Sequence, residues 1–120
     1  MSANTFCRVI ASIVLAALSA QAHATYTCSG TVKGVSVEPT TGDVLAESIG
    51  TSMSWPRFCS LRQDSNGITT AGCKAVYTAL LTAQASGRSV TVWVNGPTAS
   101  CGALPAWNFV EGFYFLRIND

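Results

Sequence analysis

Apolar and polar positions alternate most regularly over residues 89–94, where valines occupy one side of the segment and Thr91 and Trp93 the other. A period of two is typical of a half-buried strand. Directly upstream, apolar residues recur at helical spacing between Thr70, the expected N-cap, and Gly87, the expected helix stop. The recurring residues are Cys73, Val76, Tyr77, Leu80 and Ala83. The pattern therefore predicts one helix followed at once by a strand.

Four other segments have the composition of strands, and their residue ranges are 26–37, 43–49, 52–61 and 108–118. The apolar parity shifts within the first, which predicts a bulge or bend near Gly30 or Gly34. A turn at residues 39–42 predicts a hairpin, and Pro56 favours an edge position. Three strands, a helix and two strands match a five-stranded oligonucleotide/oligosaccharide-binding (OB) barrel. We expect a mainly β protein, a five-stranded OB-fold barrel with one α-helix between strands 3 and 4.

The first 24 residues have the pattern of a secretory signal peptide. Arg8 precedes an apolar run over residues 9–18, and Ala22-His23-Ala24 supplies small residues for cleavage. The run is shorter than the roughly 20 residues that span a bilayer, and no later segment approaches that length. We therefore expect a single domain over residues 25–120, secreted or periplasmic, with no membrane insertion.

Removal of the leader changes the inventory of charged and catalytic groups. The chain has seven Lys and Arg and six Asp and Glu, so loss of Arg8 leaves a net charge of zero. A neutral domain has little electrostatic support for nucleic-acid binding. The single histidine, His23, also leaves, which excludes histidine-dependent triads and ordinary zinc sites. No glycine-rich phosphate loop is present. We expect no catalytic residue, no metal and no cofactor, and hence no enzyme.

Four cysteines remain after cleavage, an even number that in an oxidising compartment indicates two disulfides. Three pairings are possible. We favour Cys59 with Cys73, because the turn at Asn66-Gly67 can fold that segment back on itself. This choice leaves Cys28 to pair with Cys101.

Two groups of charged residues could each be a functional site or an ordinary surface feature. The first turn is flanked by three acids, Glu38, Asp43 and Glu47. They could bind Ca²⁺ or form an acid/base pair. The favoured interpretation is a hairpin whose acids are solvated. Arg57 and Arg62 bracket Cys59 and could grip a carboxylate. A surface ion pair with Asp64 is the favoured interpretation for these arginines.

Several stretches resemble the pentameric B subunits of bacterial AB5 toxins. The unit Arg57-Phe58-Cys59 with Cys73 looks like the Phe-Cys…Cys unit of the subtilase cytotoxin and typhoid toxin B subunits. Ser29-Gly30 followed by Thr41-Gly42 is similar to the first hairpin of the same subunits. The resemblance covers most of the chain after residue 24 in a patchy way.

A second branch of that family is echoed as well. Residues 79–92 resemble the helix-to-strand segment of the Shiga toxin B subunit, and residues 28–32 resemble its first strand. In that branch the first-strand cysteine pairs with one just after the fourth strand. The resemblance therefore supports the pairing of Cys28 with Cys101.

The resemblance implies a glycan receptor module that assembles as a ring, with helices lining a pore that holds a catalytic A subunit. We accordingly expect a secreted, carbohydrate-binding homopentamer that recognises host cell-surface glycans, sialylated ones included. Sugar binding requires aromatic faces and fixed polar groups, which this chain offers, and requires neither histidine nor metal. The alternative is a stand-alone secreted or periplasmic OB-fold protein that binds a protein partner, as an inhibitor or envelope factor.

The resemblance also implies candidate carbohydrate-binding residues. Ser29 matches a serine that bonds the terminal sialic acid in the subtilase and typhoid branch. Polar residues after the third-strand cysteine assist there, and the corresponding residues here are Arg62, Gln63 and Asp64. That branch also has an aromatic residue in the fourth strand, where this chain has Val94. Trp93 is the favoured aromatic ligand platform, because strand alternation places it opposite the valine face.

Overall fold

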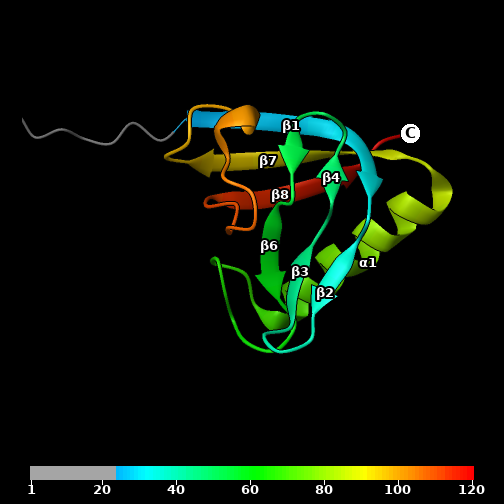
Figure 1. Ribbon diagram of the computed structural model, residues 1–120, viewed down its shortest axis with the longest axis vertical. Helices are drawn as coiled ribbons and strands as arrows, with labels where there is room; N and C mark the ends of the chain where they lie inside the picture. The colour runs from blue at the N-terminus through cyan, green and yellow to red at the C-terminus, as the bar shows by residue number, and fades with distance from the viewer. Residues whose placement is uncertain (1–23) are drawn as a thin grey trace, which may run out of the picture.

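The computed structural model describes residues 24–120 and contains two antiparallel sheets and one long helix (Figure 1). The predicted leader lies outside the described residues, apart from Ala24. In chain order the elements are β1 (Ala24–Lys33), β2 (Ser36–Glu38), β3 (Asp43–Leu45), β4 (Ser48–Ile49), β5 (Met53–Ser54), β6 (Arg57–Ser60), α1 (Thr70–Ser86), β7 (Ser89–Gly96), the short 3₁₀ helix η1 (Cys101–Ala103) and β8 (Phe113–Ile118).

The five-stranded sheet has the order β5-β4-β1-β7-β8, and the three-stranded sheet has the order β2-β3-β6. The mainly β class and the single long helix between β6 and β7 are confirmed within residues 24–120. A closed barrel is not found in this part of the chain. One parallel bridge, between Arg57 and Phe109, links β6 to the segment before β8. Its hydrogen bonds run from the Arg57 amide to the Asn108 carbonyl (3.3 Å) and from the Val110 amide to the Arg57 carbonyl (2.8 Å).

The first three predicted strands are each broken in two, because the backbone turns from one sheet into the other. The predicted bend near Gly34 is confirmed: its φ of 62° separates β1 from β2. The strand predicted over residues 43–49 is interrupted where the Glu47 amide bonds back to the Lys33 carbonyl (2.9 Å). The strand predicted over residues 52–61 breaks at Trp55, which has a φ of 46°, and at Pro56. The two halves of each strand therefore lie in different sheets.

The last predicted strand is too long at its start. Residues 108–112 form a loop with the single bridge at Phe109, and β8 begins only at Phe113. The cause is Gly112, whose φ is 85° and whose missing Cβ would lie 2.2 Å from the Asn95 carbonyl oxygen. Only glycine accommodates that approach, and the chain enters β8 after it.

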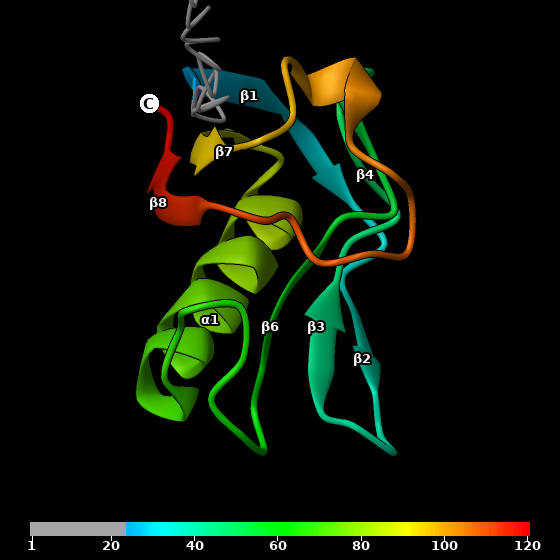
Figure 2. The same cartoon turned by 90° about the vertical axis from the view of Figure 1, so that its left-hand side faces the viewer.

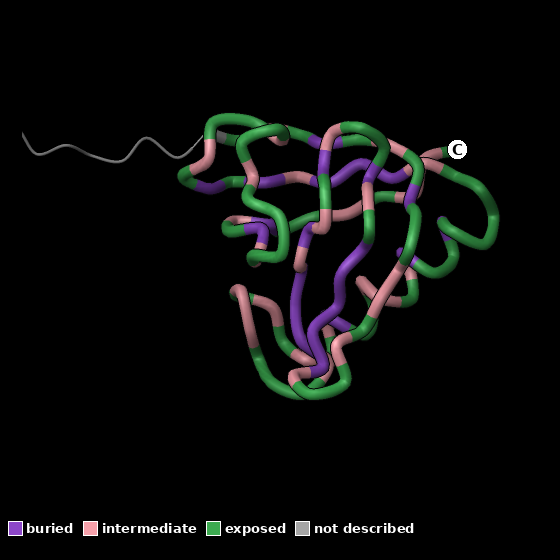
Figure 3. The backbone as a smooth tube through the Cα atoms, viewed as in Figure 1, coloured by how far each residue is buried: buried purple, intermediate pink, exposed green. Residues whose placement is uncertain are grey.

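Helix α1 packs beside the strands, opposite the β2–β3 hairpin, with β6 between them (Figure 2). Its fully buried residues are Cys73, Leu80 and Ala83, and these lie on the predicted apolar stripe. The central strands are buried along much of their length, as the purple segments of Figure 3 show. Phe58 is completely buried and meets Phe113 edge-to-face, with ring centroids 5.1 Å apart. Burial of such apolar surface is the main source of stability.

The helix begins one residue earlier than the predicted cap implies. Thr69, with an extended backbone, is the N-cap, and its side-chain oxygen accepts a hydrogen bond from the Gly72 amide (3.1 Å). Thr70 is the first helical residue instead, and its amide donates to Asp64 Oδ1 (3.1 Å). The predicted stop at Gly87 is confirmed by its left-handed backbone, with a φ of 67°.

This correction gives a direct test. Thr69→Ala is expected to lower the free energy of unfolding by about 1 kcal/mol, because the Gly72 amide loses its capping acceptor. Thr70→Ala is the matched control and should change stability by less than about 0.5 kcal/mol. Urea unfolding followed by circular dichroism measures both. A larger loss of stability in Thr70→Ala than in Thr69→Ala would show that Thr69 is not the N-cap.

Both disulfides pair as predicted, Cys28 with Cys101 and Cys59 with Cys73. The first ties β1 to η1, and the second ties β6 to the first turn of α1. Such bonds form in oxidising compartments, which agrees with a protein that works outside the cytoplasm.

Two glycines allow β1 and the loop after β4 to touch. A Cβ on Gly30 would lie 2.5 Å from the Cα of Gly50, and a Cβ on Gly50 would lie 2.9 Å from the Cα of Gly30. The Gly50 amide donates to the Thr31 carbonyl (2.8 Å), so the close approach is also a point of pairing. Any side chain at either position would push the two backbones apart.

Candidate functional site

Two tryptophans form a stacked pair at the surface. The rings of Trp55 and Trp107 lie 4.1 Å apart between centroids and are inclined by 14°. Trp107 is 54% exposed, whereas Trp55 is partly buried. The pair borders a hollow of about 360 Å³, here called the tryptophan cleft, whose other lining residues are Ser36, Val37, Glu38, Leu45 and Arg57. An indole surface is therefore displayed to solvent beside a charged group.

Both tryptophans have a left-handed backbone, with φ of 46° at Trp55 and 67° at Trp107. For a bulky residue this conformation costs on the order of 1–3 kcal/mol. The Trp107 amide donates to the Trp55 carbonyl (2.9 Å), which holds the two turns together. Backbone strain of this kind concentrates at binding and active sites. The coincidence of two strained residues with one exposed ring pair marks this region as the strongest candidate site.

An ion group forms one wall of the cleft. The Arg57 Nη1 donates to Glu38 Oε2 (3.0 Å) and to Asp43 Oδ2, and the Arg57 Nε donates to the Trp107 carbonyl (3.1 Å). The side chains of Asp43, Arg57 and Glu38 are 5%, 19% and 42% exposed. Arg57 thus joins both carboxylates to the tryptophan loop, and Glu38 is the member that faces solvent.

The preferred sequence interpretations of these charges were wrong. Arg57 pairs with Glu38 and Asp43 rather than with Asp64. The solvated hairpin interpretation also fails for Asp43, which is buried because the β3–β6 pairing carries it beneath Arg57. Residues 24–120 contain no group of three or more side chains suited to hold a metal ion.

Ser29 and Trp93 lie together on the five-stranded sheet, on the adjacent strands β1 and β7. The Ser29 hydroxyl bonds that of Thr91 (2.8 Å), and the Asn119 amide nitrogen donates to the same Thr91 oxygen (3.1 Å). Trp93 meets Phe115 edge-to-face at 5.1 Å.

On this face of the sheet, contacts within the protein already occupy the groups that a sugar would use. The Arg117 guanidinium lies over the Trp93 ring at 5.4 Å and occupies one face of the indole. The hydroxyl of Ser29 is already part of the network with Thr91. This face is therefore a weaker sugar platform than the tryptophan cleft, and the roles of Ser29 and Trp93 stay predictions.

Arg62, Gln63 and Asp64 lie elsewhere, in the loop that follows β6 (Figure 1). The Arg62 Nη1 donates to the Thr40 carbonyl (2.8 Å), and its aliphatic part covers Gly42 of the β2–β3 turn. Asp64 accepts from the Thr70 amide at the helix start, and Gln63 is exposed. No hydrogen bond, ion pair or ring contact among residues 24–120 joins this loop to Ser29 or Trp93, so the structure does not unite the five residues in one site.

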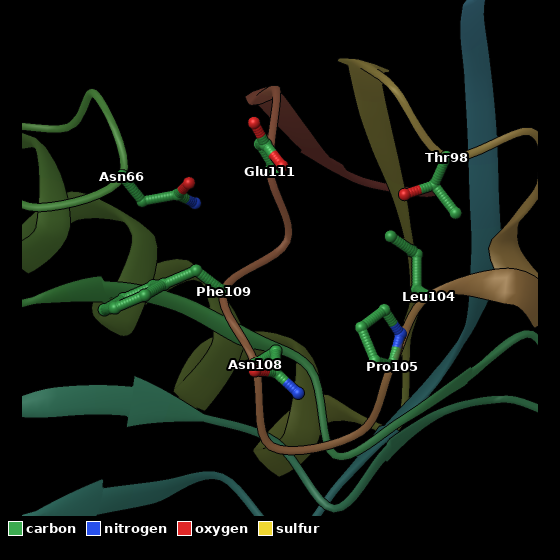
Figure 4. Close-up of a pocket in the computed structure, with 7 residues that line it drawn as sticks. All are labelled: Asn66, Thr98, Leu104, Pro105, Asn108, Phe109 and Glu111. Carbon is green, nitrogen blue, oxygen red and sulfur yellow. The ribbon is translucent and has the colours of Figure 1, made fainter.

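A second hollow, of about 390 Å³, lies under the loop that precedes β8 (Figure 4). The Asn66 and Glu111 side chains face it from one side, and Leu104 and Pro105 from the other. The Asn66 amide nitrogen is committed to the carbonyls of Phe58 and Val110, at 2.9 Å each. This amide therefore secures the loop rather than facing a ligand, and the other polar groups at the hollow are Thr98, Asn108 and Glu111.

The hydroxyl oxygen of Tyr26 is buried and has no hydrogen-bond partner within residues 24–120. Burial raises the pKa of Tyr26, and the nearby Thr98 hydroxyl opposes that rise without meeting hydrogen-bond geometry. The phenol therefore stays protonated at neutral pH.

The fold and the site together define a small, disulfide-bonded, mainly β protein with a tryptophan cleft. No family model, characterised protein or solved structure matches the chain. No helix within residues 24–120 has the length and apolarity needed to cross a membrane.

Proposed function

We propose that the protein is a secreted or periplasmic carbohydrate-binding protein whose sugar site is the tryptophan cleft. The observation that carries this proposal is the stacked Trp55–Trp107 pair, which presents an exposed ring beside fixed polar groups. The C–H face of a pyranose packs on an indole ring, and its hydroxyls require donors and acceptors at the rim of that ring. Glu38 and Arg57 supply both at the wall of the cleft.

We further propose that the chain is a ring-forming B subunit of AB5 type with an OB-fold arrangement. Support comes from the strand pairing: the first predicted strand pairs with the second and fourth, the second with the third, and the fourth with the fifth. The isolated Arg57–Phe109 bridge lies where the third and fifth strands would meet in such a barrel. The disulfide pairing that the resemblance implies also supports it. In this proposal the partners are host glycans, other copies of the chain in a homopentamer and a catalytic A subunit.

The alternative function is binding of a protein partner by a stand-alone barrel. One observation favours it: Tyr114 and Phe115 are 56% and 53% exposed on β8, which is an edge strand. Exposed aromatics on an unpaired edge suit a protein surface as well as a second copy of the chain.

Two measurements on the protein without its leader decide between these functions. A glycan array is expected to show selective binding, and light scattering at micromolar concentration is expected to show a pentamer. A silent array would sink the carbohydrate proposal and favour the protein partner. A monomer that still binds glycans would sink only the ring.

A further inference from the structure

In the ion group at the wall of the tryptophan cleft, negative charges outnumber positive ones. One cation, Arg57, faces two carboxylates, Glu38 and Asp43, so the formal charge of the ion group is −1. Both carboxylates bond the same guanidinium nitrogen, and the Arg57 Nε is committed to the Trp107 carbonyl. The arginine is therefore neutralised from within the fold.

The arrangement also decides which charge a ligand meets first. Glu38 is 42% exposed, whereas the Arg57 side chain is 19% exposed and Asp43 only 5%. Turning Arg57 toward a ligand would leave Asp43 buried without its partner, which is strongly unfavourable. An incoming carboxylate thus meets a rim with net negative charge, because two carboxylates already pair with Arg57.

A neutral pyranose fits the same surface. Trp107 and Val37, which are 54% and 36% exposed, offer apolar contacts for a C–H face. The carboxylate of Glu38 can accept hydrogen bonds from sugar hydroxyls in addition to the one from Arg57. Charge-assisted bonds of this kind are stronger than neutral ones.

We infer that the tryptophan cleft binds glycans that end in an uncharged pyranose and rejects glycans that end in a carboxylate-bearing sugar such as sialic acid. This inference rests on the proposed carbohydrate function and names its ligand class. It departs from the sialylated glycans that the resemblance implies.

Glycan pairs that differ only by a terminal sialic acid test the inference, with lactose and 3′-sialyllactose as one pair on a wider array. In each pair that binds, the uncharged glycan is expected to bind at least about tenfold more tightly than the sialylated one. The sialic acid carboxylate would be brought next to the carboxylate of Glu38, and like charges weaken binding. Equal or tighter binding of the sialylated members would overturn the inference and leave the proposed function standing. Binding of neither member of any pair would overturn the proposed function itself.

Glu38→Gln identifies the cause of the discrimination. In this variant the affinity for the uncharged glycan divided by that for the sialylated glycan is expected to fall about fivefold or more. The reason is that the charge of Glu38 is removed while Asp43 still holds Arg57. Glu111→Gln removes an exposed carboxylate outside the cleft and should leave this ratio unchanged. Thermal melts confirm that both variants fold. An unchanged ratio in folded Glu38→Gln would contradict the inference.

Discussion

Replacing Trp107 with alanine is expected to weaken glycan binding by about 30-fold or more, because large aromatic anchors dominate binding energy when they are removed. The ring is 54% exposed and stacks on Trp55, so its removal destroys the platform without opening the core. Isothermal titration with the tightest-binding glycan of the array measures the loss.

Trp93→Ala is the matched control, since it removes the same side chain from the five-stranded sheet. It is expected to bind within about threefold of the wild type, because Trp93 does not line the tryptophan cleft and binding energy concentrates in a few residues of the site itself. Loss of binding in Trp93→Ala together with retention in Trp107→Ala would move the sugar site to the sheet face that contains Ser29.

Removal of the Cys28–Cys101 disulfide by a double alanine substitution is expected to lower the free energy of unfolding by about 4 kcal/mol, from the chain entropy of its long loop. The bonded residues are 73 positions apart, against 14 for Cys59–Cys73, whose removal should cost about 3 kcal/mol. A domain of this size has a modest core, so either loss removes a large part of its stability.

Urea unfolding of both double variants measures these losses, and the reduced wild-type protein is the reference for losing both bonds. Losses below about 1 kcal/mol for the long loop would contradict the entropic account. A larger loss for the short loop would indicate that burial of Cys59 and Cys73, both fully inaccessible, outweighs loop length.

Local patterns in the sequence predicted the elements whose signals are themselves local. The helix that ends at Gly87, the strand that begins at Ser89 and the turn before Asp43 all follow from spacing and turn chemistry. The breaks at Trp55 and in the 43–49 segment did not, because they depend on hydrogen bonds to other strands. The N-cap was misplaced by one residue because Thr69 and Thr70 are chemically equivalent in sequence.

The candidate site was harder to predict for the same reason. Strand alternation identified Trp93 as outward-facing, but it could not show that Arg117 covers its ring. The Trp55–Trp107 stack joins residues far apart in the chain, and a backbone hydrogen bond from the Trp107 amide to the Trp55 carbonyl holds their two turns together. A weak signal existed: Trp55 directly precedes a proline and Trp107 follows one closely, and prolines mark turns and loops.

The contact between Gly30 and Gly50 limits how this fold can diverge. A side chain added at either glycine would meet backbone atoms of the opposite segment. Backbone atoms cannot be made smaller by mutation, so no second substitution can compensate for a change at either position. The two glycines should therefore be inherited together, even in descendants whose cleft residues have drifted to suit another ligand. The spacing of that pair, with the four bonded cysteines, is the signature by which distant relatives of this chain would be recognised.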